Sequence, residues 1–270
     1  DGTLTVNDGD GTSTISGASF VDSFSVLSVI PDPSGLTFNN DGTKMFVSGS
    51  TGAGVAEYTL STAFDVSTAS HVDTLSVSAQ DTYPKGHAFN SDGTKMFVVG
   101  LTGKDVNEYT LSTGFDVSTA SFVDSFSVSS QETAPVGITF NTDGTKMFVI
   151  GHSGADVNEY TLSTGFDVST ASYDSNFSVS SQEIYPSSVT FSNDGKKMFV
   201  IGINDDEVNE YSLSTGFDVS TASFVGNFSV SPGVPAPNCL AFNNDGTKMF
   251  VGDHLGKDIN EYTLTTPFSL

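Results

Sequence analysis

The chain has 270 residues, of which 32 are acidic and nine are basic, and its formal net charge is −23. A surface this acidic repels phosphate backbones, and without a basic patch the chain is not expected to bind nucleic acid. No stretch approaches 18 apolar residues, so we expect neither a transmembrane helix nor insertion into a membrane.

The first 15 residues are predicted to be a leader or linker, because they precede the repeated part of the chain. They contain the run Asn7-Asp-Gly-Asp-Gly-Thr12, in which Asp8 and Asp10 are weak candidates for calcium ligands. A full calcium loop would carry a later bidentate Glu, which this run lacks. We therefore expect no required cofactor, and calcium is the one that the sequence leaves open.

One phrase organises the chain from residue 16 onward. The phrase Asp-Gly-Thr-Lys-Met-Phe-Val, with Lys196 in place of Thr in the fourth copy, begins at five positions that are each 51 residues apart: Asp41, Asp92, Asp143, Asp194 and Asp245. A period near 50 residues is typical of propellers, solenoids and arrays.

Each unit is predicted to form four short antiparallel strands. In the third unit an Asp-Gly turn follows the first strand and supplies the positive φ that a tight hairpin needs. The strands are expected at Val136–Phe140, Lys146–Ile150, Val157–Leu162 and Asn176–Val179. Four such strands without a helical period make one propeller blade.

The chain ends in the middle of a unit, and the missing fourth strand lies at the other end of the sequence. The run from Ala18 to Val26 is identical to the run from Ala120 to Val128. We therefore predict an all-β fold, a single five-bladed β-propeller of residues 16–270 with four antiparallel strands per blade, closed by the N-terminal strand completing the last blade. This closure hides the sheet edges that a linear array would expose.

The repeats resemble two known groups. They are similar to YVTN-type propeller repeats, with Asn-Asp-Gly-Thr-Lys-Met-Phe-Val in the place of Pro-Asp-Gly-x-x-Leu-Tyr-Val. They resemble more closely the Asp-Gly-Thr-Lys-Met-Tyr/Phe-Val repeats of marine bacterial and phage surface proteins. In those proteins Asn-Glu-Tyr-x-Leu-Ser-Thr and Phe-Ser-Val-Ser-Ser-Gln-Glu follow, as they do here at Asn107–Thr113 and Phe126–Glu132. The resemblance implies the propeller fold and says little about function, because propellers host many activities.

Connections between strands alternate between the two ends of a propeller. The turns between first and second strands (1–2 turns) and the connections between third and fourth strands (3–4 connections) share one end and are nearly constant in sequence. The turns between second and third strands (2–3 turns) and the loops from a fourth strand to the next unit (4–1 loops) share the other end, which we call the variable face because it differs between units. Either exposed turns have drifted freely, or this face is specialised for a partner.

The variable face supplies the predicted ligand- or partner-binding residues. Two adjacent blades have apolar 4–1 loops, and these loops are expected to form one exposed apolar patch of Val29, Ile30, Pro31, Val234 and Pro235. The other candidates on this face are Tyr83, His152, Tyr185, Asn204 and His254. Asp205 and Asp206 are further weak candidates for a metal site.

Charged residues recur in the second and third strands of every unit. The pairs are Lys44 and Glu57, Lys95 and Glu108, Lys146 and Glu159, Lys197 and Glu210, and Lys248 and Glu261. A cross-strand ion pair worth roughly a few tenths of a kcal/mol is the first interpretation. A fivefold ring of carboxylates that binds cations is the second.

The remaining chemistry-bearing residues are few. His152 and His254 share one position in blades two apart and could join Asp253 in a metal site, although the gap is wide for ligands about 2 Å from one ion. His87 is expected in the core or channel, and Cys239 is expected to be a buried free thiol.

The sequence favours a non-catalytic extracellular module, on a cell or virion surface, that binds a glycan or a cell-surface protein. Sites could be fivefold, as in tachylectin-type lectins, or single. Alternatives are a self-assembling structural unit bridged by divalent cations, and a glycosidase-like enzyme. The enzyme alternative is disfavoured because no acid lies at the innermost positions and glycosidic chemistry needs two carboxyls. We expect the propeller to belong to a larger polypeptide or assembly.

Overall fold

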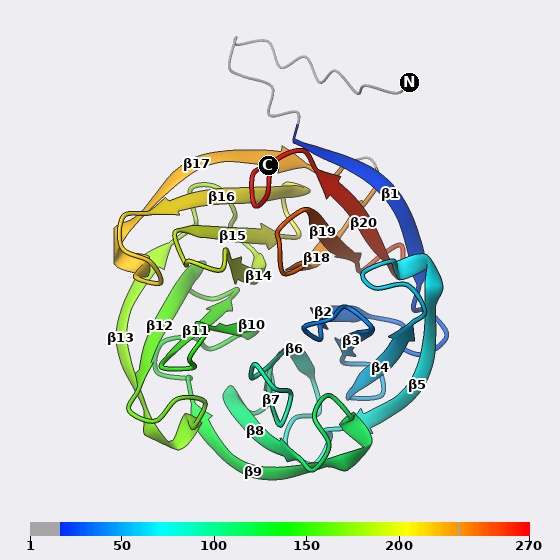
Figure 1. Ribbon diagram of the computed structural model, residues 1–270. Helices are drawn as coiled ribbons and strands as arrows, with labels where there is room; N and C mark the ends of the chain where they lie inside the picture. Colours follow the sequence, from blue (N-terminus) through cyan, green and yellow to red (C-terminus); the bar gives the residue numbers. More distant parts are fainter. Residues whose placement is uncertain (1–16, 232) are drawn as a thin grey trace.

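The protein is a ring of five β-sheets. The structure, a computed structural model, describes residues 17–231 and 233–270, and in these residues twenty strands form five four-stranded antiparallel sheets. In each sheet the first strand lies nearest the axis of the ring and the fourth lies at its rim (Figure 1). The predicted all-β, five-bladed propeller is confirmed. The leader, with Asp8 and Asp10, lies outside the described residues.

Blades 1 to 5 follow one another along the chain, and each contains a first, second, third and fourth strand. The strands in that order are β2 (Pro33–Phe38), β3 (Lys44–Gly49), β4 (Gly54–Leu60) and β5 (Ala69–Ser76) in blade 1; β6 (Pro84–Phe89), β7 (Lys95–Gly100), β8 (Asp105–Leu111) and β9 (Ala120–Ser127) in blade 2; β10 (Pro135–Phe140), β11 (Lys146–Gly151), β12 (Asp156–Leu162) and β13 (Ala171–Ser178) in blade 3; β14 (Pro186–Phe191), β15 (Lys197–Gly202), β16 (Glu207–Leu213) and β17 (Ala222–Ser229) in blade 4; and β18 (Pro237–Phe242), β19 (Lys248–Asp253), β20 (Asp258–Leu264) and β1 (Ala18–Ser25) in blade 5. The 3–4 connections of blades 1 to 4 contain short 3₁₀ helices: η1 (Val66–Thr68), η2 (Val117–Thr119), η3 (Val168–Thr170) and η4 (Val219–Thr221).

The ring is closed by strands from opposite ends of the sequence. β1 pairs antiparallel with β20, with Ala18 opposite Leu264, and so completes the sheet formed by β18, β19 and β20 (Figure 1). The N–H of Thr265 donates to the carbonyl of Gly17 over 2.7 Å. The predicted closure by the N-terminal strand is confirmed.

The repeated phrase forms a hairpin turn followed by a buried strand. Asp41 Oδ1 accepts hydrogen bonds from the Thr43 N–H (3.0 Å) and hydroxyl (2.5 Å), which lower the pKa of that carboxyl. Gly42 has a φ of 71°, and a Cβ there would lie 2.2 Å from the ring of Phe64. The turn therefore needs glycine for its conformation and also for the aromatic ring packed against it.

The hydrophobic core lies between the blades. Met45, Phe46 and Val47 of β3 are fully buried and point alternately to the two faces of the sheet. The Phe46 ring packs on Phe89 of blade 2, with ring centroids 4.5 Å apart. Each blade is thus apolar on both faces, and five aromatic contacts of this kind hold neighbouring sheets together.

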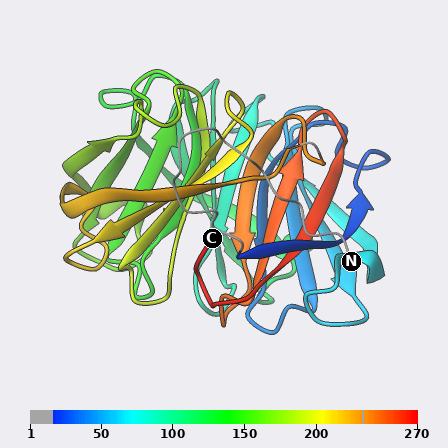
Figure 2. The same ribbon diagram turned by 90° about the horizontal axis from the view of Figure 1, so that it is seen from above.

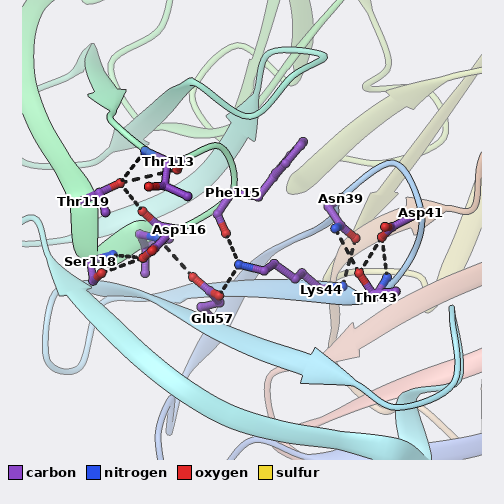
Figure 3. Close-up of polar contacts among 11 residues, drawn as sticks. Asn39, Asp41, Thr43, Lys44, Glu57, Thr113, Phe115, Asp116, Ser118 and Thr119 are labelled. Carbon is purple, nitrogen blue, oxygen red and sulfur yellow. Dashed lines mark hydrogen bonds and ion pairs between the residues drawn. The ribbon is translucent and has the colours of Figure 1, made fainter.

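The recurring Lys and Glu residues join neighbouring blades. Lys44 Nζ lies 2.7 Å from Glu57 Oε1 within blade 1, and it also donates to the carbonyl of Phe115 in blade 2 over 2.6 Å (Figure 3). Glu57 accepts a second hydrogen bond, of 3.1 Å, from the N–H of Val117 in η2. We call this four-residue arrangement the lysine clasp, and it recurs at all five blade interfaces.

The clasps confirm the predicted ion pairs, but these pairs are more buried than the surface pairs expected from the sequence. The Glu side chains are 1–6% exposed and the Lys side chains 26–34%, so the carboxylate of each pair is enclosed and the ammonium group is partly exposed. Removing one partner of a buried pair costs about 3–5 kcal/mol, because the other charge stays buried alone. The alternative, a carboxylate ring that binds cations, is wrong, because Lys and backbone N–H groups already occupy the carboxylates.

Candidate functional site

The side view places the strand connections at two opposite ends of the ring (Figure 2). At the end with the 1–2 turns, the central channel widens into a cavity of about 300 Å³ lined by the first strands. At the variable face a separate pocket of about 120 Å³ forms the other end of the channel. We call this pocket the channel mouth.

The channel mouth is built from residues at equivalent positions of different blades. Its floor consists of the second residue of each first strand: Ser34, Lys85, Val136, Ser187 and Asn238. Its wall consists of side chains from three 2–3 turns: His152, Ile203 and His254. Most of these equivalent positions differ in residue type, so the fivefold symmetry of the backbone is lost at this pocket.

Lys85 and the two histidines give the mouth its chemical character. The Nζ of Lys85 lies 4.6 Å from the centre of the Tyr83 ring, in a cation–π contact. Burial, and then the positive charge of Lys85, lower the pKa of His152 below its usual 6.5. Burial lowers the pKa of His254 as well, followed by the charges of Lys257 and Lys85. Both imidazoles are therefore neutral at pH 7.

The structure brings His152 and His254 to one pocket but does not make a metal site of them. Within the described part of the chain, no group of three or more His, Cys, Asp and Glu side chains could hold a metal ion. Asp253, the expected third ligand, accepts backbone hydrogen bonds from Leu255 (2.9 Å) and Ala236 (3.2 Å). Calcium binding stays an untested prediction.

The other polar and aromatic candidates lie in exposed turns and loops of the variable face. Tyr83 and Tyr185 are each nearly half exposed, and the Tyr185 ring lies edge-on to His152 with centroids 6.0 Å apart. Asn204 is exposed and donates to Asp205 over 2.7 Å. Asp206 has a φ of 52°, and burial followed by the nearby carboxylates of Asp253 and Asp205 raises its pKa.

The predicted exposed apolar patch is wrong. Ile30 is 1% exposed and Val234 is fully buried, and they belong to two different hydrophobic clusters. Val29 is half-buried and packs against the cluster that contains Ile30. Ile30 and Val234 face inward and cannot contact a partner, whereas Val29 is only partly buried.

The buried position of Ile30 and Val234 has a structural role that explains why it varies. In the three other blades it holds an acid, and Glu132 accepts hydrogen bonds from the N–H groups of Ala134 (2.6 Å), Ser153 (3.2 Å) and Gly154 (3.1 Å). The carboxylate thereby ties a 4–1 loop to the neighbouring 2–3 turn. Asp81 and Glu183 do the same in blades 2 and 4.

Blades 1 and 5 supply this carboxylate from another position. In blade 5, Asp253 at the end of β19 accepts from the N–H groups of Ala236 and Leu255, which are equivalent to Ala134 and Ser153 of blade 3. In blade 1, Asp32 accepts from the N–H of Thr51 over 2.8 Å. Much of the sequence variation in the 4–1 loops therefore arises because different blades supply the same structural carboxylate from different positions.

Sequence reasoning missed Lys85, Asn238 and Ile203 as members of the site. Lys85 and Asn238 lie at innermost strand positions, for which sequence reasoning considered only acidic residues. The available signal was that five of the nine lysines recur in every unit, whereas Lys85 does not. The structure confirms the burial of His87 and Cys239, which are 3% and 0% exposed.

Comparisons with known proteins extend only to the fold. No protein-family model and no curated protein matches the chain. Similar solved structures include a functionally unknown protein from Desulfotomaculum acetoxidans, with 17% identity, a TM-score of 0.52, and coverage of 87% of this chain and 69% of that one.

Two further solved structures carry the name "putative 6-phosphogluconolactonase". The protein from Bacteroides uniformis has 15% identity and a TM-score of 0.53, over 89% of this chain and 70% of that one. The protein from Bacteroides fragilis has 15% identity and a TM-score of 0.52, over 84% and 65%. At such identities the likeness supports the propeller fold and carries no activity over.

Proposed function

We propose that the protein is a non-catalytic extracellular binding module that recognises a glycan or surface partner through its variable face, centred on the channel mouth. The observation that carries the proposal is the composition of the mouth. The blades have nearly the same sequence at the opposite end of the ring, whereas the side chains that meet at this pocket differ from blade to blade. Binding sites in propellers and other rigid scaffolds commonly lie in such loops.

The scaffold holds the mouth in a fixed geometry. Lysine clasps fix neighbouring blades, and the carboxylates of Asp32, Asp81, Glu132, Glu183 and Asp253 fix the loops around the pocket. Tyr83 and Tyr185 stand exposed on the same face, where an aromatic ring can stack on a sugar. Preorganisation of this kind reduces the entropy lost on binding.

A single site is favoured over five equivalent sites. The position of Tyr83 and Tyr185 is occupied by Asp32, Ala134 and Ala236 in the other blades. Three blades therefore lack the aromatic platform that a fivefold lectin would need. The mouth, in contrast, occurs once on the axis of the ring.

The non-catalytic part of the proposal rests on the environment of the reactive groups. His87 is enclosed, with its ring nitrogens 2.9 Å from Ser48 Oγ and 2.8 Å from Thr37 Oγ1, and burial lowers its pKa to about 3. Burial raises the pKa of the Cys239 thiol to about 12, so it is not a nucleophile at neutral pH. No carboxylate is found among the described residues that line the channel cavities.

The rim of the ring supports the structural alternative to a lesser degree. Each fourth strand carries exposed residues such as Phe20 and Val21, which could pack against a second copy. A β-bulge between Phe20 and Asp22 interrupts this strand, and Asp22 is exposed. Bulges and charges are the usual features that prevent edge-to-edge pairing of sheets.

A glycan array, probed with and without calcium, tests the proposed function. The wild-type chain is expected to bind a defined group of glycans, and the variants Lys85→Val and His152→Leu are expected to lose that binding. Each variant introduces a residue that another blade already has at the equivalent position, Val136 and Leu101. Lys196→Thr, on the opposite end of the ring, is the matched control and should bind as the wild type does. Absence of binding to any glycan or purified cell surface would refute the proposal.

A further inference from the structure

We infer that the channel mouth is an anion site that holds the carboxylate or sulfate group of an acidic sugar. The inference rests on the proposed function and names the chemistry of its ligand. It is carried by three nitrogen-bearing side chains, Lys85, His152 and His254, that line one pocket from three different blades.

Lys85 is a cation without a carboxylate partner among the residues that the structure describes, in a strongly acidic protein. All five ion pairs within the described part of the chain use the lysines of the clasps, and Lys85 is in none of them. Its backbone is fixed, because its carbonyl accepts a hydrogen bond from Ser34 Oγ over 3.1 Å. Its ammonium group lies over the Tyr83 ring and remains free to bind an anion.

The two histidines lie close enough to Lys85 for its charge to lower their pKa values. A neutral imidazole donates one hydrogen bond, and a protonated imidazole donates two and adds a positive charge. An oxyanion between Lys85 and the imidazoles would therefore receive several charge-assisted hydrogen bonds.

None of the carboxylates around the mouth forms an ion pair with Lys85, and backbone N–H groups already occupy their oxygens. Glu132, beside His152, accepts from three N–H groups. Asp253 and Asp32, beside His254, are held by the 2–3 turns and 4–1 loops of their own blades. The mouth thus combines two imidazoles with an ammonium group that is in no ion pair among the described residues, beside carboxylates that keep their negative charge.

The size and the remaining groups of the pocket fit the end of a sugar chain. A pocket of about 120 Å³ is smaller than the roughly 300–1,000 Å³ of drug-sized sites, so it accepts a terminal group only. Ser34, Ser187 and Asn238 line its floor. Their donors bind the backbone carbonyls of Lys85, Ile201 and Pro33, so these side chains offer chiefly oxygen acceptors to sugar hydroxyls. Asn238 Oδ1 is buried and has no hydrogen-bond partner among the described residues.

Binding at this site should strengthen as the pH falls. A bound anion favours the protonated imidazoles and so raises the pKa values of His152 and His254. The groups that face them are Lys85, Glu132 and the Tyr185 ring for His152, and Lys85, Lys257, Asp32 and Asp253 for His254. Because binding raises both pKa values, the affinity begins to rise as the pH falls through the pKa values of the bound state, and the gain is complete below those of the free state, which lie under 6.5.

The test is an NMR titration of the histidine side chains with glucuronate, glucose 6-sulfate and glucose, repeated with sodium sulfate alone. The chain has four histidines, and His71 on the rim and His87 in the core serve as internal controls. Glucuronate and glucose 6-sulfate should shift the His152 and His254 signals in a saturable way and raise both pKa values. Affinity should rise roughly tenfold between pH 7.5 and 5.5, and Lys85→Val should reduce it at least roughly tenfold.

Each other outcome has a distinct meaning. If glucose shifts His152 and His254 as glucuronate does, the mouth binds sugar but the anion inference is wrong, and the proposed function stands. If no charged probe shifts them even at pH 5.5, the anion inference is wrong, and the glycan array decides the proposed function separately. If sulfate alone matches the acidic sugars, the anion site is supported but recognition of a sugar acid is not.

Discussion

Glu57 in β4 of blade 1 accepts a hydrogen bond from the backbone N–H of Val117 in η2, a residue 60 positions further along the chain in blade 2. The same carboxylate is paired with Lys44, which reaches the carbonyl of Phe115 in that neighbouring connection. One buried ion pair thus satisfies both a donor and an acceptor of the next blade. In the last blade interface before closure, Glu210 accepts from the N–H of Leu270 in the same manner.

Breaking one clasp should destabilise the whole ring. Lys146→Met leaves Glu159, which is 1% exposed, without its partner and removes the donor to the Phe217 carbonyl. We expect the free energy of unfolding to fall by about 3–5 kcal/mol, measured by urea denaturation. Lys196→Thr, an exposed lysine outside the clasps, is the control and should change stability by less than about 0.5 kcal/mol. A loss below about 1 kcal/mol in Lys146→Met would show that the clasps are ordinary surface pairs.

Alanine substitutions at two glycines with positive φ distinguish the backbone strain of a turn from the steric clash with a packed side chain. Gly144 in a 1–2 turn has a φ of 73°, and a Cβ there would lie 2.2 Å from the Phe166 ring. Gly52 in a 2–3 turn has a φ of 87°, but no atom lies within 4 Å of its Cβ position. Gly52→Ala should cost about 1 kcal/mol, the backbone cost alone, and Gly144→Ala should cost at least about twice as much. Equal melting temperatures of the two variants would mean that Phe166 does not constrain the turn.

Relocation of the structural carboxylate predicts a double-mutant rescue in blade 5. Asp253→Gly leaves the Ala236 and Leu255 N–H groups without an acceptor, and Val234→Glu alone buries a second carboxylate near Asp253. Each single variant should be destabilised by about 1–3 kcal/mol. The double variant reproduces the arrangement of Glu132 and Gly151 in blade 3, so it should recover most of that loss. Additive effects in chemical denaturation would contradict a shared role for the two positions.

His87 should make the ring sensitive to mild acid. The unfolded side chain takes up a proton near pH 6.5, whereas the folded one, with a pKa of about 3, does not. Stability is therefore full above pH 6.5 and falls as the pH drops from 6.5 toward 3. Between pH 7 and 5 the wild type should lose about 2 kcal/mol more than His87→Ile, which introduces the residue of blade 3 at this position, Ile138. Identical pH profiles of the two proteins would show that His87 is not held neutral.

The fold could be predicted from the sequence because five copies of one unit show the same pattern of strands and turns. The fixed interval between copies of the phrase that begins at Asp41 predicted the strands, the Asp-Gly turns and the closure by β1, all of which the structure contains. The fourth strands extend further than predicted: β13 begins at Ala171 rather than Asn176, because a bulge lets its first residues continue the pairing with β12.

The candidate site could be predicted only in part. Comparison of the five units predicted the variable face, but it did not predict which side chains of that face point outward. Ile30 and Val234 look like exposed apolar residues in sequence, and the structure buries them at the position where Glu132 lies in another blade. Lys85 and His254 come from blades 2 and 5, so their approach to one pocket depends on the closed ring and not on any local pattern.

The number of ligands bound per chain tests the central claim most directly. Native mass spectrometry of the wild type with the glycan that the array identifies should show one ligand per chain, and Lys85→Val should show none under the same conditions. Five ligands per chain, or one ligand that Lys85→Val binds equally well, would place recognition away from the channel mouth and contradict the account.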